Sequence, residues 1–399
     1  MPSILIIAED GVTVTGVQHI PDNEPLLNIT IPDNIKRIEP FAFSKATSLQ
    51  SVTLPASLQS IGSFAFADCT ALRTINLPDG LTEIADYAFS GCTSLQDVDL
   101  PASITSIGSF AFAECTALQT IDLPNSITHI GEFAFSRCTS LQSIDLPKGL
   151  KQVDAALCYG CTALQSLFIP DGTLTVGGVS TQEEEGTITY GAFGACTALE
   201  LVILPPSLQE ITDGAFAGCT ALQEIDIPTA VNRIGPHAFE GCSLLQTINL
   251  PSLLTEVATG AFRGCQLLQG PFLLPAVQSI GDSAFQDCTS LKAVFPGEQL
   301  QQIGRWAFQG AKSLQTISLP AALQTIGSWA FTDCTAVKSI HSNIGTPANL
   351  AVPGNAFSDV IFQHAQLHIP AGSRWEYRHH PIFSRFNHLD IDTEQNNDK

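Results

Sequence analysis

The chain has 399 residues, of which 44% are hydrophobic and only 14% are charged. This composition excludes an intrinsically disordered chain, which would be rich in charge and poor in apolar residues. The 17 basic and 38 acidic residues give a formal net charge of −21. Nucleic acid is therefore excluded as a partner, because binding to phosphates needs clustered Lys and Arg. A basic protein, a cation and a neutral glycan are all compatible with this charge.

The first ten residues, from Met1 to Asp10, contain no basic segment, and their apolar run is short. No stretch of the chain approaches 18 uninterrupted apolar residues. The sequence therefore predicts neither a signal peptide nor a transmembrane segment, and it assigns the protein to no compartment.

Residues 1–40 do not fit the pattern that fills most of the remaining chain. The dipeptide Asp10-Gly11 lies between two apolar stretches, which predicts a β-hairpin. An array of repeats leaves an apolar edge at its first unit, and this edge needs a cover. We therefore predict that residues 1–40 form an N-terminal cap.

Residues 41–345 repeat a pattern with a period of 23 residues. The clearest copy runs from Cys115 to Cys138 and contains the blocks Cys-Thr-x-Leu, Ile-x-Leu-Pro, Ile-Gly and Ala-Phe. A unit of this length cannot bury a core of its own, so successive units must stack as the coils of a solenoid. The cysteines that mark the period are Cys69, Cys92, Cys115, Cys138 and Cys161, then Cys196, Cys219, Cys242, Cys265 and Cys288.

Each coil is expected to contain two short extended stretches. In one coil Ile75 and Leu77 point inward while Thr74 and Asn76 point outward, because side chains alternate along a strand. A proline ends this strand, and the Ile-Gly pairs mark a second extended stretch followed by a turn. The expected fold is a β-rich solenoid with a parallel sheet on one face and short strands and turns on the other.

These blocks resemble the BspA-like class of leucine-rich repeats over roughly residues 29–340. The segment that begins at Ile369-Pro-Ala-Gly also resembles the closing unit of that class. The resemblance implies a right-handed leucine-rich-repeat superhelix. It further implies a protein-interaction or adhesion module, often at the cell surface or secreted, and it names no ligand.

One coil carries an insertion. The step from Cys161 to Cys196 is 35 residues, so 12 extra residues enter near 176–187, including Glu183-Glu184-Glu185. Insertions in solenoids emerge as surface loops, often on a working face. The alternative is a tolerated, solvated loop.

The outward positions of the strands predict a binding surface. Asp99, Asp122 and Asp145 occupy the same position in three successive coils, so a bound cation or basic group would relieve their repulsion. Apolar residues follow on the same face, and apolar groups with polar rims often mark interaction sites. The alternative is a solvated face whose apolar residues are shielded by the inserted loop. The predicted site residues are Asp97, Asp99, Asp122, Asp145, Phe168, Leu201, Ile203 and Asp226.

A second column consists of aromatic residues two positions before the Phe of each Ala-Phe pair. Exposed rings in this column could hold sugar rings or a protein, whereas rings that stack on one another would hold the turns in place. We expect stacking. The residues are Phe41, Phe64, Tyr87, Phe110 and Phe133, then Trp306 and Trp329.

The twelve cysteines are predicted to be buried free thiols. Eleven share one repeat position, where Ala46 and Ala311 also occur, which suits a small site in the core. Cys158 and Cys161 have the spacing of zinc and redox motifs. However, Cys158 falls on the position of the ladder Phe and no second pair accompanies it, so no metal and no cofactor is predicted.

The pattern decays after Cys334. Residues 346–392 are predicted to form a last degenerate repeat, around Ala356-Phe357, and a C-terminal cap. The cap would be closed by the bulky side chains of Trp375, Tyr377, Phe383 and Phe386. Residues 393–399 are polar and are expected to form a frayed tail.

No catalytic motif is present: the chain lacks a P-loop, Gly-x-Gly-x-x-Gly after a strand, His-Glu-x-x-His and Gly-x-Ser-x-Gly. We therefore predict a non-enzymatic, monomeric scaffold that binds a protein partner, for which a basic partner suits the acidic charge, or mediates adhesion through its strand face. A glycan- or cation-binding surface protein and a structural rod are the alternatives.

Overall fold

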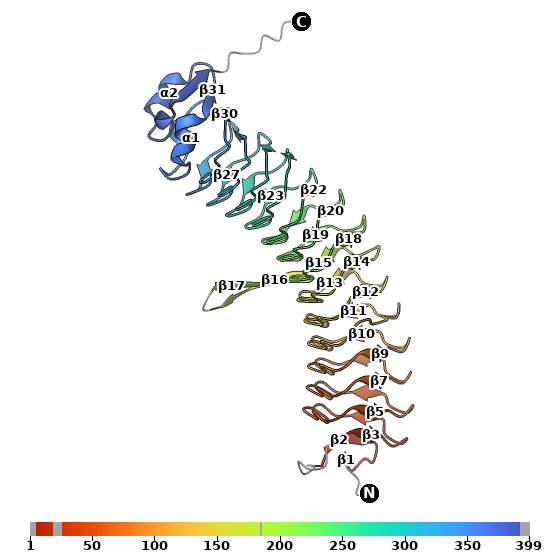
Figure 1. Ribbon diagram of the computed structural model, residues 1–399. Helices are drawn as coiled ribbons and strands as arrows, with labels where there is room; N and C mark the ends of the chain where they lie inside the picture. Colours follow the sequence, from red (N-terminus) through yellow and green to blue (C-terminus); the bar gives the residue numbers. More distant parts are fainter. Residues whose placement is uncertain (1–4, 19–25, 184–185, 392–399) are drawn as a thin grey trace. The chain divides into compact units, whose positions relative to one another are not determined.

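Figure 1 shows the computed structural model of the protein, which describes residues 5–18, 26–183 and 186–391. These residues form a β-solenoid of stacked, mostly parallel strands with almost no helix, as the repeat predicts. The chain divides into two compact units, Met1–Leu208 and Gln209–Lys399, and each is described by itself.

One coil of the first unit illustrates how the repeat folds. Strand β7 (Thr74–Asn76) buries Ile75 and exposes its two neighbours, so the expected alternation is confirmed. The chain turns after the proline that follows β7, and the second strand, β8 (Glu83–Ile84), buries Ile84. Two turns then lead through Phe89 to Cys92, both of which are fully buried. Each coil thus places its apolar residues in one core between the strand face and the turn face.

In the described part of the first unit the coils present two rows of short strands, and the coil at residues 120–122 lacks the first of its two strands. The first strands of these coils are β3 (Asn28–Thr30), β5 (Ser51–Thr53), β7, β9 (Asp97–Asp99), β12 (Ser143–Asp145), β14 (Ser166–Phe168) and β18 (Leu201–Ile203). The second strands are β4 (Arg37–Ile38), β6 (Ser60–Ile61), β8, β10 (Ser106–Ile107), β11 (His129–Ile130), β13 (Gln152–Val153) and β15 (Thr175–Val176).

The second unit continues the same pattern. Its first strands are β20 (Glu224–Asp226), β22 (Thr247–Asn249), β24 (Phe272–Leu274), β26 (Val294–Pro296), β28 (Thr316–Leu319), β30 (Ser339–Ser342), β31 (Gln366–Ile369) and β32 (His388–Ile391). Its second strands are β19 (Glu210–Ile211), β21 (Arg233–Ile234), β23 (Glu256–Val257), β25 (Ser279–Ile280), β27 (Gln302–Ile303) and β29 (Thr325–Ile326). The helices are α1 (Asp359–His364) and α2 (Arg374–His379), with 3-10 turns η1 (Pro347–Asn349) and η2 (Phe383–Arg385).

A ladder of phenylalanines and a column of thiols hold the coils together. The rings from Phe43 to Phe135 stack in register with centroids 5.0 to 5.6 Å apart. The Sγ of Cys69 donates a hydrogen bond of 3.1 Å to the carbonyl oxygen of Phe43 in the preceding coil. All twelve cysteines are buried and free, which confirms the prediction.

The glycine of the Ile-Gly pair lets neighbouring coils approach closely. The amide of Gly131 donates a hydrogen bond of 2.8 Å to the carbonyl oxygen of Ile107 in the preceding coil. A Cβ on Gly131 would lie only 2.6 Å from the amide nitrogen of Ser109. Any larger residue would therefore push the coils apart at this point.

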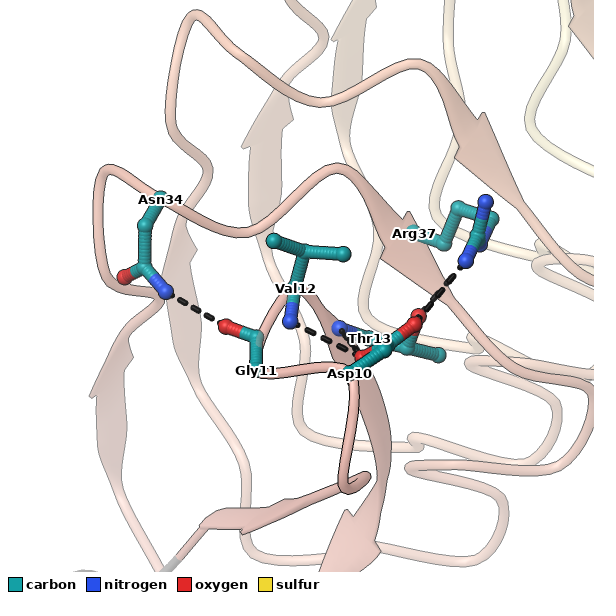
Figure 2. Close-up of polar contacts among 6 residues, drawn as sticks. All are labelled: Asp10, Gly11, Val12, Thr13, Asn34 and Arg37. Carbon is teal, nitrogen blue, oxygen red and sulfur yellow. Dashed lines mark hydrogen bonds and ion pairs between the residues drawn. The ribbon is translucent and has the colours of Figure 1, made fainter.

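The N-terminal hairpin is confirmed. Strands β1 (Leu5–Ile7) and β2 (Thr13–Val17) pair antiparallel, and β2 also pairs parallel with β4 of the first coil. Figure 2 shows how the Asp10 carboxylate organises the turn by accepting hydrogen bonds from Thr13, Val12 and Arg37. The bonds from Thr13 and Val12 hold the pKa of Asp10 below its ordinary value. The role of residues 1–40 as a cap stays a prediction.

The insertion is a β-hairpin, and the expectation of a loop near 176–187 was wrong. Strands β16 (Gly178–Glu183) and β17 (Gly186–Gly191) pair antiparallel over their whole length. Figure 1 shows this hairpin projecting out of the stack. Backbone pairing satisfies the polar groups that an irregular loop would expose to water. Glu184 and Glu185 lie outside the described residues.

The strand ladder is interrupted in the coil that carries Asp122. Residues 120–122 form no strand, although they lie within the described chain and Ile121 is buried. The ladder therefore consists of β3-β5-β7-β9 on one side of this coil and β12-β14-β18 on the other. Asp99, Asp122 and Asp145 fall on successive coils, and repulsion between like charges opposes close pairing here.

The C-terminal segment is partly as expected. Tyr377 and Phe383 are fully buried and Phe386 is nearly so, and the Tyr377 hydroxyl donates a hydrogen bond of 2.9 Å to the carbonyl oxygen of Ile344. Trp375 is 67% exposed, so its predicted place in the core was wrong. It lies on the outer side of α2 and stacks on His379, one helical turn later.

No helix in the described part of the chain is long and apolar enough to cross a membrane. The predicted boundaries at 40, 345 and 392 stay predictions, and the tail 393–399 lies outside the described residues.

Candidate binding site on the outward strand face

Three of the predicted site positions are aligned by strand pairing. Asp145, Phe168 and Ile203 are register partners on β12, β14 and β18, and Leu201 lies on the same strand as Ile203. Their neighbours Ile144, Leu167 and Val202 point into the core and are buried. The alternation of the strands therefore fixes an acidic residue beside an apolar pair on the outward face.

The apolar residues of this face are open to solvent. Phe168, Leu201 and Ile203 are each 46% to 47% exposed. The hairpin β16–β17 projects from the other side of the first unit, where Tyr190 of β17 contacts Phe133 and Tyr159. The alternative in which the insertion shields these residues was therefore wrong. Exposed apolar patches with polar rims are common at interaction surfaces, so this face stays the predicted site.

A hollow with a volume of about 610 Å³ lies on this face and brings the acidic and apolar residues together. The lining residues come from three successive coils: Asp122, Leu123, Asn125, Asp145, Leu146, Lys148, Phe168, Pro170 and Asp171. Three of them, Asp122, Asp145 and Phe168, belong to the predicted site.

The far side of the hollow is formed by the turns that follow the strands. Lys148 follows the strand-ending proline of one coil and Asp171 that of the next, so the two occupy equivalent positions. The Lys148 amide donates a hydrogen bond of 3.4 Å to the Asn125 side chain in the preceding coil. Sequence reasoning missed these residues because it considered only strand positions. The repeat pattern could have identified them, since the residue after each strand-ending proline lies next to the outward strand positions.

The remaining predicted residues do not line the hollow. Asp97 and Asp99 are exposed on β9, before the interruption of the ladder, and Leu201 and Ile203 extend the apolar patch beyond Phe168. Asp226 belongs to β20 of the second unit, and its place relative to the others is not described.

The charge of the hollow favours a basic ligand. Three carboxylates, those of Asp122, Asp145 and Asp171, face one ammonium group, that of Lys148, which leaves a formal charge of −2. A cation held by side chains alone would need several converging ligands. Within the described ranges, no three His, Cys, Asp or Glu side chains converge in this way.

The aromatic column is stacked, as predicted. Ring centroids from Phe41 to Phe133 are 4.3 to 4.7 Å apart with interplanar angles of 4° to 8°, and Trp306 stacks on Trp329 at 5.5 Å. The faces of the rings therefore cover one another and leave edges toward solvent. Only Phe41, at the end of the stack, is more than half exposed, at 59%.

Comparison with known families decides the identity of the repeat. A family model described as BspA type leucine-rich repeat region matches residues 22–101, 66–185, 178–273 and 271–371. The chain belongs to this family. Its BspA-type repeats make it a leucine-rich-repeat scaffold, as the sequence predicts. No curated protein matches the chain.

Solved structures share the architecture of this BspA-type chain. A leucine-rich repeat protein from Bacteroides ovatus ATCC 8483 is 26% identical to this chain. The match covers 97% of this chain and 97% of the Bacteroides ovatus chain, and the two superpose with a TM-score of 0.79. The pneumococcal vaccine antigen PcpA is 16% identical to this chain, and the match covers 98% of this chain and 96% of PcpA with a TM-score of 0.54. At this low identity the match shows similarity of fold alone.

The Cys158 and Cys161 pair of the BspA-type array lies inside the core. A hydrogen bond with Cys161 and burial raise the pKa of the Cys158 thiol well above its usual range. Redox thiols need a lowered pKa and access to solvent. The environment of this pair therefore favours the structural role.

Proposed function

We propose that this BspA-type chain is a non-catalytic binding protein that recognises a protein partner with the strand face of its first unit. The observation that supports the proposal is the hollow in which Asp122 and Asp145 lie beside the exposed ring of Phe168. Repeat scaffolds commonly bind through such extended surfaces.

The chemistry of the hollow defines the expected partner segment. A Lys or Arg side chain would lie between Asp122 and Asp145, and a neighbouring aliphatic or aromatic side chain would cover Phe168 and Ile203. Exposed ion pairs contribute only about 0–1 kcal/mol each. Covering apolar surface contributes about 25 cal/mol per Å². The apolar contact is therefore expected to carry most of the affinity, and the carboxylates to set orientation and preference for a basic segment.

The experiment combines affinity capture with a matched pair of variants. The immobilised protein is exposed to extracts of candidate host cells, captured proteins are identified, and the Kd of each purified partner is measured. The hollow variant is Asp122→Asn/Asp145→Asn/Phe168→Ser. The control, Glu224→Gln/Phe295→Ser, changes exposed outward residues of β20 and β26 in the second unit.

We expect the hollow variant to raise Kd at least about tenfold, a loss of ~1.4 kcal/mol, while the control stays within about twofold of wild type. Binding should also weaken as NaCl rises from about 0.05 M to about 0.5 M, because surface charges are screened. Circular dichroism verifies that both variants are folded. Equal Kd values for wild type and the hollow variant, or equal losses in the two variants, would exclude the hollow as the binding site.

A further inference from the structure

A second hollow lies on the turn face of the first unit, at the base of the inserted hairpin. Its volume is about 430 Å³, within the range of ~300–1,000 Å³ that is typical of small-molecule sites. The lining residues are Tyr87, Ser90, Phe110, Ala113, Glu114, Phe133, Ser136, Arg137, Tyr159 and Tyr190. None of them belongs to the hollow on the strand face, and we call this second hollow the tyrosine groove.

One wall of the tyrosine groove is the aromatic column. Tyr87, Phe110 and Phe133 stack with centroids 4.6 Å apart and are partly exposed. Each of them has a left-handed backbone, with φ between 57° and 58°. The stack and this unusual backbone conformation hold the three rings nearly parallel along the groove.

The floor is open because small residues occupy it. Ser90, Ala113 and Ser136 each lie two positions before the repeat cysteine. In the second unit the same position holds the long side chains of Glu240, Arg263, Gln286 and Gln309 in four coils, and the small residues Ala217 and Thr332 in two others. Small floor residues beside an aromatic wall therefore leave room for the hollow, and the inserted hairpin distinguishes this end of the column from the other coils.

Two tyrosines close one end of the groove. The next coil has Ala156 where the column would place another ring, and Tyr159 where the floor would have a small residue. Tyr190 of β17 lies edge-to-face with Phe133 at 5.4 Å and with Tyr159 at 5.3 Å. Tyr159 packs on Gly194, where a Cβ would come within 3.0 Å of its ring. The inserted hairpin thus supplies the ring that the repeat omits.

The opposite wall carries a balanced pair of charges. The Arg137 guanidinium lies 3.1 Å from the Glu114 carboxylate, and both side chains are more than half exposed. The two charges cancel, so the lining of the groove has no formal net charge.

We propose that the tyrosine groove binds a neutral saccharide of one or two rings. A sugar ring has apolar C–H faces that would pack against the ring edges of the column and against Tyr159 and Tyr190, which lie outside the face-to-face stack, and hydroxyls that both donate and accept hydrogen bonds. Glu114 accepts such bonds, Arg137 donates them, and the phenol groups of Tyr87, Tyr159 and Tyr190 do both. The Glu114 carboxylate and the net charge of −21 would repel an anionic sugar, and the Arg137 guanidinium would repel a cationic ligand.

The test is a glycan array that carries neutral, sialylated and sulfated oligosaccharides, followed by calorimetric titration of the best neutral binder. Glu114→Gln keeps the size of the side chain and removes the charged acceptor. Tyr190→Ala removes the ring supplied by the hairpin. Phe41→Ala is the matched control, because Phe41 belongs to the same aromatic column and lies outside the groove.

We expect binding to neutral glycans, a Kd raised at least about tenfold in Glu114→Gln and Tyr190→Ala, and a Kd within about twofold of wild type in Phe41→Ala. The hollow variant of the strand face should bind the same glycan as wild type does, so this proposal and the proposed function fail separately. Absence of neutral-glycan binding, selection of sialylated or sulfated glycans alone, or unchanged affinity in both groove variants would overturn the proposal. Since Glu114 is exposed, its variant is expected to fold, and circular dichroism checks this.

Discussion

The strand face and the turn face of the first unit are built from the same coils, yet they constrain their side chains differently. On the strand face, β14 fixes the direction of Phe168 through backbone pairing, and its side chain takes little part in packing. On the turn face, Phe110 lies between the rings of Tyr87 and Phe133 and has a left-handed backbone, so its side chain is part of the framework.

This difference determines how each face can evolve a site. Outward strand positions can change from Asp145 to Phe168 to Ile203 in successive coils without disturbing the ladder. On the turn face the hollow lies where the column is interrupted at Ala156 and where Tyr190 of the inserted hairpin supplies another ring. Three measurements test this difference between the two faces.

The largest expected effect concerns the thiol column on which both faces depend. Burial raises the pKa of Cys69, Cys115 and Cys242 from 9.0 to about 12. The pKa is also raised in Cys92, Cys138, Cys158, Cys196, Cys265, Cys288 and Cys334. Above pH 9 the unfolded chain loses these protons while the folded chain keeps them, so the stability present below pH 9 is lost as pH rises. We expect cooperative unfolding between about pH 9 and 11.

The magnitude follows from the number of thiols. Each shifted thiol costs about 1.4 kcal/mol per pH unit above its ordinary pKa. Ten such thiols cost on the order of 10 kcal/mol one unit above that value, similar to the ~5–15 kcal/mol stability of a typical domain. Circular dichroism and thiolate absorbance across pH 7 to 11 measure both events. The pair Cys115→Ala/Cys138→Ala removes two of the ten shifted thiols and should lower the slope of the pH dependence by about a fifth, and titration of thiolates in a folded chain would refute this account.

The second effect concerns the core ladder. Phe112 is fully buried between Phe89 and Phe135. Phe112→Ala is expected to lower the free energy of unfolding by about 3–5 kcal/mol, because it removes a ring and leaves a cavity. Urea denaturation measures the loss. A loss of unfolding free energy below about 1 kcal/mol would show that the phenylalanine ladder contributes little to the stacking of the coils.

The smallest effect compares the two faces directly. Phe110→Ala should cost about 1–3 kcal/mol, because two stacked pairs are lost at about 0.5–1.5 kcal/mol each. Phe168→Ala should cost less than about 1 kcal/mol, because it removes one cross-strand contact of an exposed ring. Urea denaturation gives the midpoint of each variant, and the two midpoints report the difference in stability provided that the m-values are equal. If Phe168→Ala were the more costly change, the strand face would be structural and our distinction between the faces would be wrong.

The sequence was sufficient to predict what repeats. The inward strand residues such as Ile75, the thiol column and the stacked aromatic column all follow from the period, since a position that recurs every 23 residues has the same environment in each coil. The acidic and apolar character of the strand face also followed, because outward positions are fixed by alternation.

Features that occur once were not predictable in this way. The hairpin β16–β17 depends on pairing of a segment that has no counterpart in other coils, and the position of Tyr190 against Phe133 depends on that hairpin. The interruption at Asp122 occurs in a coil whose repeat pattern matches that of its neighbours, so the period alone does not reveal it. Exposure of Trp375 depends on which side of α2 faces the core, which one short helix does not reveal.

The most direct test of the proposed function is contact mapping at the hollow of the strand face. Phe168 is replaced by the photoreactive residue p-benzoylphenylalanine, a captured partner is bound, and crosslinked peptides are identified after irradiation. The same replacement at Phe295, which is outward and 42% exposed on β26, is the control. Our account predicts a crosslink from position 168 to a segment that contains Lys or Arg, and none from position 295. A bound partner that crosslinks only from position 295, or from neither position, would contradict it.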